Sequence, residues 1–120
     1  MALTGSCHCG AIAFELDLAG GDAPTDAYDC NCSMCRRRGA LLAFFAADAL
    51  TLTTDAAALA TYRFHTQRLA HRFCRVCGIA PYSEGEDPAS GRRQVAVNLR
   101  CLDGLDLATL RIVPVDGASL

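Results

Sequence analysis

Eight of the 120 residues are cysteine, and their spacing constrains this chain more than any other feature. They form a C-x-C pair at Cys7 and Cys9, a C-x-C-x-x-C triplet at Cys30, Cys32 and Cys35, a C-x-x-C pair at Cys74 and Cys77, and a single Cys101. The N-terminus has neither the basic start nor the apolar stretch of a secretory signal, so we expect a reduced, cytoplasmic protein. In that compartment, cysteines at such spacings are more often metal ligands than disulfides.

The C-x-C pair and the C-x-x-C pair together predict one closed metal site. On a strand, residues i and i+2 point the same way about 6.6 Å apart, which would place Cys7 and Cys9 on one face. In a tight turn, residues i and i+3 come within about 7 Å, so Cys74 and Cys77 can approach one ion. Four thiolates make a closed tetrahedral zinc site of the structural kind. The alternative for the C-x-x-C pair is a redox motif, but no βαβ pattern surrounds it.

The triplet Cys30, Cys32 and Cys35 predicts a different site. Three protein ligands that leave the fourth position open to water or substrate are the arrangement of catalytic zinc. The alternative is a second structural zinc, with Cys101, His71 or His8 as its fourth ligand. Of these candidates, Cys101 is expected to be a small buried side chain, and His8 to face away from its neighbouring cysteines. His65 and His71 have no ligand spacing to any cysteine.

Alternating apolar residues and turn signals predict a single, mainly β domain of short antiparallel strands over residues 1–120. The clearest strand is 11–18, where Ile12, Phe14 and Leu16 share one face. Further strands are expected at 41–45, 50–53, 60–65, 69–73 and 94–100, loops at 19–26 and 84–93, and one helical turn at 55–59. Residues 105–113 fit either a strand or a short helix.

Charge and hydropathy exclude two classes of partner. The chain has eleven arginines, no lysine and 13 acidic residues, which gives a net charge of −2. Because a non-specific nucleic-acid binder needs a basic surplus, no nucleic acid is expected. The longest apolar run, residues 40–47, is far shorter than the about 20 residues that span a bilayer, so no membrane is expected either.

Four motifs together resemble one family. They are Gly5-Ser6-Cys7-His8-Cys9-Gly10, then Cys30-Asn31-Cys32-Ser33-x-Cys35-Arg36, then Arg72-Phe73-Cys74-x-x-Cys77-Gly78, and Val97-Asn98-Leu99-Arg100-Cys101-Leu102-Asp103. Their order and spacing resemble the glutathione-dependent formaldehyde-activating enzymes, which are related to a domain of centromere protein V. The resemblance implies a tent-like β fold similar to Mss4. It also implies structural zinc at Cys7, Cys9, Cys74 and Cys77, and catalytic zinc at Cys30, Cys32 and Cys35.

The resemblance further implies a carbon–sulfur lyase that interconverts glutathione plus formaldehyde, or a related small thiol and aldehyde, with an S-hydroxyalkyl adduct. A three-thiolate zinc is a weak Lewis acid, so it suits a soft substrate sulfur better than hydroxide. Arg36 is a candidate for a substrate carboxylate, with a solvated surface role as its alternative. Asn31 and Ser33 are candidates for hydrogen bonds to thiolate sulfur. Arg37 and Arg38 are expected to be solvated.

Phe44 and Phe45 follow the triplet and are candidates for a pocket wall, although core packing is expected for at least one.

Two other functions remain open. In the first, both zinc ions are structural and the protein is a non-catalytic binding module for a protein partner. In the second, the triplet is a thiol redox sensor that releases its zinc when oxidised.

Overall fold

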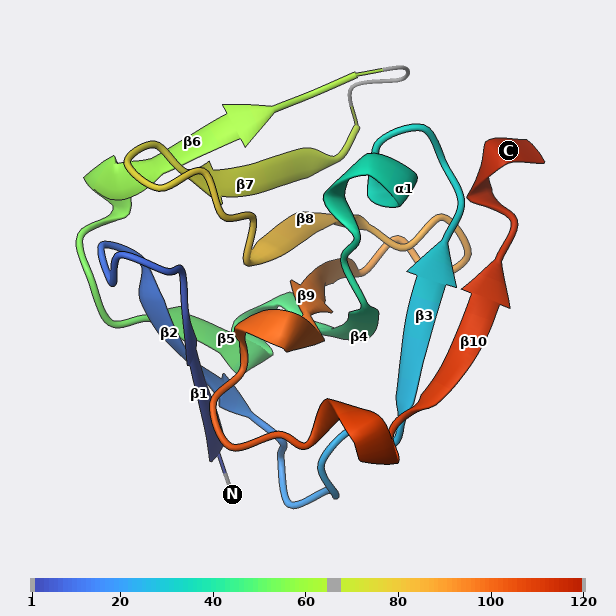
Figure 1. The fold of residues 1–120 in the computed structure, drawn as a ribbon, viewed down its shortest axis with the longest axis horizontal. Coiled ribbons are helices and arrows are strands. Elements are labelled where there is room, and N and C mark those ends of the chain that lie inside the picture. The colour runs from blue at the N-terminus through green and yellow to red at the C-terminus, as the bar shows by residue number, and fades with distance from the viewer. Residues whose placement is uncertain (1, 65–67, 120) are drawn as a thin grey trace.

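The computed structural model describes residues 2–64 and 68–119, which fold into two sheets (Figure 1). The smaller sheet has the order β1-β2-β5 and is antiparallel, with β1 at Ala2–Ser6, β2 at Ala13–Asp17 and β5 at Leu50–Leu52. The larger sheet has the order β10-β3-β4-β9-β8-β7-β6. Its strands are β3 (Asp26–Cys30), β4 (Leu42–Ala46), β6 (Leu59–Tyr62), β7 (Ala70–Cys74), β8 (Tyr82–Glu86), β9 (Arg93–Asn98) and β10 (Arg111–Val115).

Helical structure is limited to single turns. The α-helical turn α1 spans Cys35–Arg38 and lies between the ends of β3 and β7 (Figure 1). The 3-10 turns are η1 (Ala47–Ala49), η2 (Ala56–Ala58), η3 (Leu99–Cys101), η4 (Leu107–Thr109) and η5 (Gly117–Ser119). None of the helices in the described ranges has the length and apolar character that crossing a membrane requires.

The hydrophobic core lies between the two sheets. In β2 and just before it, Ile12, Phe14 and Leu16 are almost completely buried, as their alternation predicts. From the larger sheet, Val95 and Val97 of β9 point into the same core, while Gln94, Ala96 and Asn98 alternate to the opposite face and are only half-buried. The larger sheet therefore has one face in the core and a second face free to build a site.

The mainly β architecture expected from the sequence is confirmed, with three corrections. Strands β1 and β3 were not expected. The stretch 84–93 is not all loop, because β8 reaches Glu86 and β9 starts at Arg93. The strands are not all antiparallel, since β10 pairs with β3 in parallel.

The remaining expectations fall close to the observed elements. The helical turn expected at 55–59 is η2, and the ambiguous stretch 105–113 contains both η4 and the start of β10. The strand expected at 60–65 corresponds to β6, and its last residue, His65, lies outside the described residues.

Candidate metal centres

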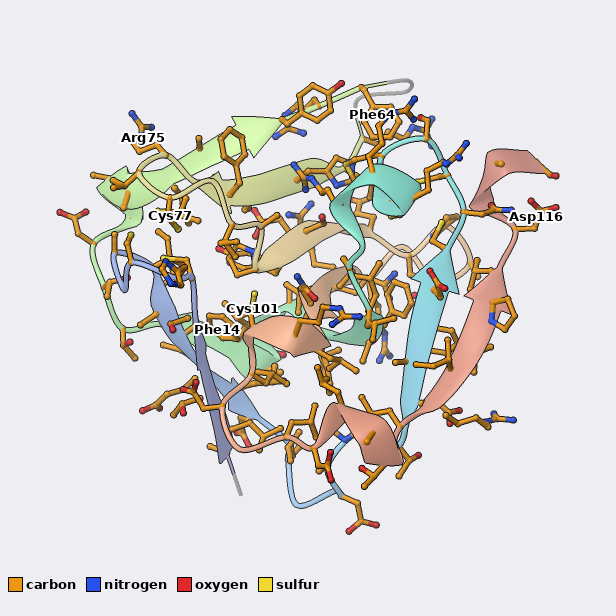
Figure 2. The ribbon with its side chains drawn as sticks, in the orientation of Figure 1. Phe14, Phe64, Arg75, Cys77, Cys101 and Asp116 are labelled. Atoms are coloured by element: carbon orange, nitrogen blue, oxygen red, sulfur yellow. The ribbon has the colours of Figure 1, made fainter. Side chains whose placement is uncertain are left out.

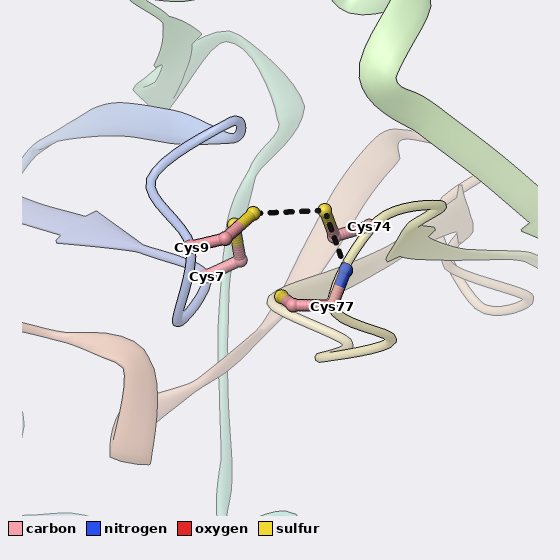
Figure 3. Close-up of side chains that lie close together, drawn as sticks. All are labelled: Cys7, Cys9, Cys74 and Cys77. Carbon is pink, nitrogen blue, oxygen red and sulfur yellow. Dashed lines mark hydrogen bonds between the residues drawn. The ribbon is translucent and has the colours of Figure 1, made fainter.

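The two outer cysteine pairs meet at one point, although they are 65 residues apart in the chain (Figure 3). The Sγ atoms of Cys7, Cys9, Cys74 and Cys77 all lie within 4.8 Å of one another. The Sγ of Cys9 is 3.7 Å from that of Cys7 and 3.6 Å from that of Cys74. These four residues could therefore hold a metal ion.

Two backbone turns aim these sulfurs at each other. The expectation that Cys7 and Cys9 share a strand face is wrong, because β1 ends at Ser6 and a turn follows in which the Ile12 amide donates to Cys7 Sγ at 3.3 Å. The turn from Cys74 to Cys77 is confirmed. Its last hydrogen bond runs from the Gly78 amide to the Cys74 carbonyl at 2.9 Å, and Gly78 has the left-handed φ of 82° that favours glycine there.

The electrostatics of this group favour a cation. Backbone amides, that of Ile79 foremost and then that of Cys9, lower the pKa of Cys77 to about 6. The Ala11 amide lowers the pKa of Cys9, but burial and the neighbouring sulfurs outweigh it and raise that pKa to about 11. Thiolate charge is thus opposed by the neighbouring sulfurs at Cys9, and a bound metal ion would offset that repulsion.

The triplet forms a second group where β3 passes into α1. Cys30 ends β3, Cys35 begins α1, and their Sγ atoms and that of Cys32 lie within 4.8 Å of one another. The Cys35 amide donates to Cys32 Sγ at 3.3 Å. Although burial opposes it, this amide lowers the pKa of Cys32, whereas burial and the charge of Cys32 raise the pKa of Cys35. This donor set could also hold a metal ion.

The triplet offers three candidate ligand atoms. Within residues 2–64 and 68–119, no other His, Cys, Asp or Glu places a ligand atom in this group. Cys101 lies near Phe14 instead (Figure 2), and burial, followed by the charges of Cys7 and Cys77, raises its pKa to about 11. His8 is exposed at the first group, and His71 hydrogen-bonds Ser83.

A cavity of about 810 Å³ opens at the triplet, over the second face of the larger sheet. Strand register arranges its floor in two rows. One row runs Tyr28, Leu42, Asn98 across β3, β4 and β9, and the other runs Phe44, Ala96, Ser83, His71 across β4, β9, β8 and β7. Of the two phenylalanines, Phe44 lines the cavity and Phe45 packs against the core.

The arginines after the triplet have different positions. Arg36 is exposed and is not among the described residues that line the cavity, whereas Arg38 does line it. Arg37 turns back and donates to the Ser33 carbonyl at 2.8 Å. Arg38 is therefore the arginine of this run that borders the cavity, and it is exposed to solvent as the sequence predicted. Ser33 lines the cavity as well.

The C-terminal segment, residues 115–119, covers the triplet, which the sequence analysis did not foresee. The side chain of Asn31 binds this segment rather than a sulfur: its Nδ2 donates to Asp116 Oδ1 at 3.0 Å, and its Oδ1 accepts from the Ala118 amide at 2.9 Å. Gly117 lies so close that a Cβ there would overlap Cys30 Sγ. Asp116 marks this segment at the right of Figure 2.

Comparison with known proteins identifies the family of this chain. Residues 2–112 match the family described as glutathione-dependent formaldehyde-activating enzyme. The chain belongs to this family. It is also similar to a Rhodobacter sphaeroides protein of known crystal structure, with 38% identity and a TM-score of 0.76 over 92% of this chain and 97% of the other. The sequence resemblance to the family is thereby confirmed.

Proposed function

We propose that this family member is a cytoplasmic, zinc-dependent carbon–sulfur lyase that adds a small thiol to an aldehyde and catalyses the reverse reaction. The observation that carries the proposal is the triplet: three cysteine sulfurs, with no fourth ligand atom from residues 2–64 or 68–119, face a large cavity. Glutathione is the thiol that the family description suggests. In the reaction the thiol sulfur bonds to the carbonyl carbon, the C=O π bond opens, and the thiol proton moves to the oxygen.

Zinc is the metal that the donor sets favour. Both consist of cysteine sulfur alone, which selects soft or borderline metals. Tetrahedral coordination at a Zn–S length near 2.3 Å places sulfurs about 3.8 Å apart. The separations of 3.7 and 3.6 Å in the first group fit that geometry. We assign a structural zinc to Cys7, Cys9, Cys74 and Cys77, and a catalytic zinc to Cys30, Cys32 and Cys35.

Zinc bound at the triplet supplies a site that holds the substrate thiol as the thiolate, the form that attacks the aldehyde. The protein supplies the rest. The Cys35 amide donates a hydrogen bond that fixes Cys32 Sγ, and the largely apolar cavity walls surround the space beside the triplet. In the cavity floor, His71 Nδ1 lies 2.8 Å from Ser83 Oγ. These two side chains are candidates to hold the proton that passes to the carbonyl oxygen. Arg38 is the candidate for a carboxylate at the cavity rim.

The proposal can be tested with zinc-loaded protein, glutathione and formaldehyde, using NMR exchange spectroscopy to measure how fast the adduct forms and breaks. We expect faster exchange with the wild type and no acceleration with Cys32→Ser. On a cobalt-substituted sample, added glutathione should add a fourth sulfur to the second metal in X-ray absorption spectra. A second metal that ignores thiols, with no acceleration, would refute the lyase and favour the non-catalytic binding module. Zinc release by mild peroxide alone would favour the redox sensor.

A further inference from the structure

The cavity beside the triplet is much larger and more apolar than formaldehyde requires. Formaldehyde has two non-hydrogen atoms and needs about the space of one or two water molecules, each about 30 Å³. The cavity holds about 810 Å³. Most of this space must therefore serve something other than the simplest aldehyde.

Its walls are aromatic at two ends. Tyr28 and Phe44 pack with ring centroids 5.6 Å apart, and Phe64 stacks on His71 at 5.3 Å. Between these aromatic residues the floor consists of small side chains, because the second row places Ala96 and Ser83 between Phe44 and His71. Three strand spacings, about 14 Å, separate the ends of that row. The result is a slot with aromatic sides and a small-residue floor.

The charges of the slot do not match glutathione. Among the described lining residues, Arg38 is the one arginine, and there is no aspartate or glutamate. Glutathione carries two carboxylates and an ammonium group, and burying a charge without a partner is costly. Its charged ends fit the exposed arginines of α1 better than the slot, so the slot is left for the other substrate.

We infer that the slot binds the apolar substituent of the carbonyl substrate, so that the aldehyde carries an aliphatic or aromatic group of several carbons. Phe44 shows why such a group would bind: it is 49% exposed in the free protein, and a hydrocarbon chain would cover it. The inference deepens the proposed function and rests on it. The reaction is the same thiol addition, with the same balance of atoms and protons.

The test compares kcat/KM for acetaldehyde, butanal and hexanal with glutathione and zinc-loaded protein, because these three aldehydes have carbonyls of similar reactivity. We expect kcat/KM to rise about fourfold for each methylene, or roughly two-hundredfold from acetaldehyde to hexanal. Succinic semialdehyde, similar in length to pentanal but with a carboxylate end, should be a poor substrate. Binding of 1-hexanol, which cannot react, is measured by calorimetry as an independent readout.

Ala96→Leu fills the floor of the slot and should abolish both the rise with chain length and the binding of hexanol. Ala46→Leu is the matched control: Ala46 lies on the same face of β4 but outside the cavity lining, and it should keep the rise. Circular dichroism and zinc content verify folding. If Ala96→Leu does not fold, Phe44→Ala serves, with Ile112→Ala as control because Ile112 is 47% exposed outside the cavity.

The outcomes distinguish a failure of the substrate inference from a failure of the proposed lyase. Turnover that is flat along the series, or best with succinic semialdehyde, overturns the inference and leaves the lyase standing. No turnover of any aldehyde overturns the lyase and the substrate assignment with it, even if hexanol binds. A rise along the series that Ala96→Leu removes and Ala46→Leu keeps supports the inference.

Discussion

Replacing Gly117 by alanine tests how the C-terminal segment and the triplet depend on each other. A Cβ at position 117 would overlap Cys30 Sγ and would also lie 3.3 Å from Cys32 Cβ, so one side must move. Which side moves depends on whether a metal is bound. In the metal-free protein Cys30 can rotate away, at a cost of about 0.5–1.5 kcal/mol for a poor rotamer.

With a metal at the triplet, Cys30 Sγ is fixed and the segment must move instead. Moving it breaks three hydrogen bonds: from the Asn31 amide to the Val115 carbonyl, from Asn31 Nδ2 to Asp116, and from the Ala118 amide to Asn31 Oδ1. At about 0.5–1.5 kcal/mol each, they contribute about 1.5–4.5 kcal/mol. The difference between the two states, about 1–3 kcal/mol, predicts that metal binding at the triplet weakens roughly fivefold to 150-fold.

The assay is zinc competition with a chromophoric chelator, which resolves the two sites by affinity. Gly21→Ala is the control, since its Cβ would meet the Leu18 carbonyl oxygen at 3.1 Å, far from both cysteine groups. It should cost some stability without weakening either site. The reasoning is refuted if Gly117→Ala leaves the triplet's affinity unchanged, or weakens both sites equally.

Three further predictions use other parts of the molecule. Cys74→Ser should unfold or strongly destabilise the protein, whereas Cys32→Ser should leave it folded and short of one metal; far-UV dichroism and zinc analysis check this, and equal loss of fold in both contradicts it. Burial, then the charges of Arg38 and Arg63, lowers the pKa of His71. The unfolded chain therefore takes up its proton first, and stability falls as the pH drops below about 6.5. In urea titrations at pH 7.5 and 5.5, His71→Gln should lose less stability than wild type, and equal losses would refute this. Glu84→Ala should cost about 1–2 kcal/mol of unfolding free energy, since it removes the carboxylate that lies 3.0 Å from the half-buried Arg72. Asp26→Ala should cost clearly less than Glu84→Ala because its partner Arg111 is 75% exposed, and equal costs would be contrary evidence.

Local patterns predicted some parts of this molecule well. The alternation around Phe14 predicted β2 because one face of that strand is buried and the other is solvated. The cysteine spacings predicted the two groups because each turn brings its own sulfurs together within a few residues. The turn at Gly78 followed from the same local geometry.

Features that depend on distant partners could not be predicted in this way. Strand β8 was missed because its sequence, with Glu84 and Glu86, reads as an exposed loop; Arg72 of β7 pairs with Glu84 and makes the charge acceptable in a strand. The floor of the cavity depends on register between β4, β9, β8 and β7, which no single segment encodes. The same holds for residues 115–119, whose contact with Asn31 joins positions more than 80 residues apart.

The two cysteine groups differ in what a bound metal would hold together, and this difference supports the proposal that only the triplet exchanges a ligand. In the first group, a metal would join the turn after β1 to the end of β7, closing a loop of 65 residues between the two sheets, with Cys7 and Cys74 buried in the core. Closing so long a loop restricts the unfolded chain strongly, so losing that metal releases much conformational entropy. The triplet spans six residues of one connection and closes no distant loop. We therefore expect changes in its coordination to cost the fold little, as the proposed exchange of a substrate sulfur at the triplet requires.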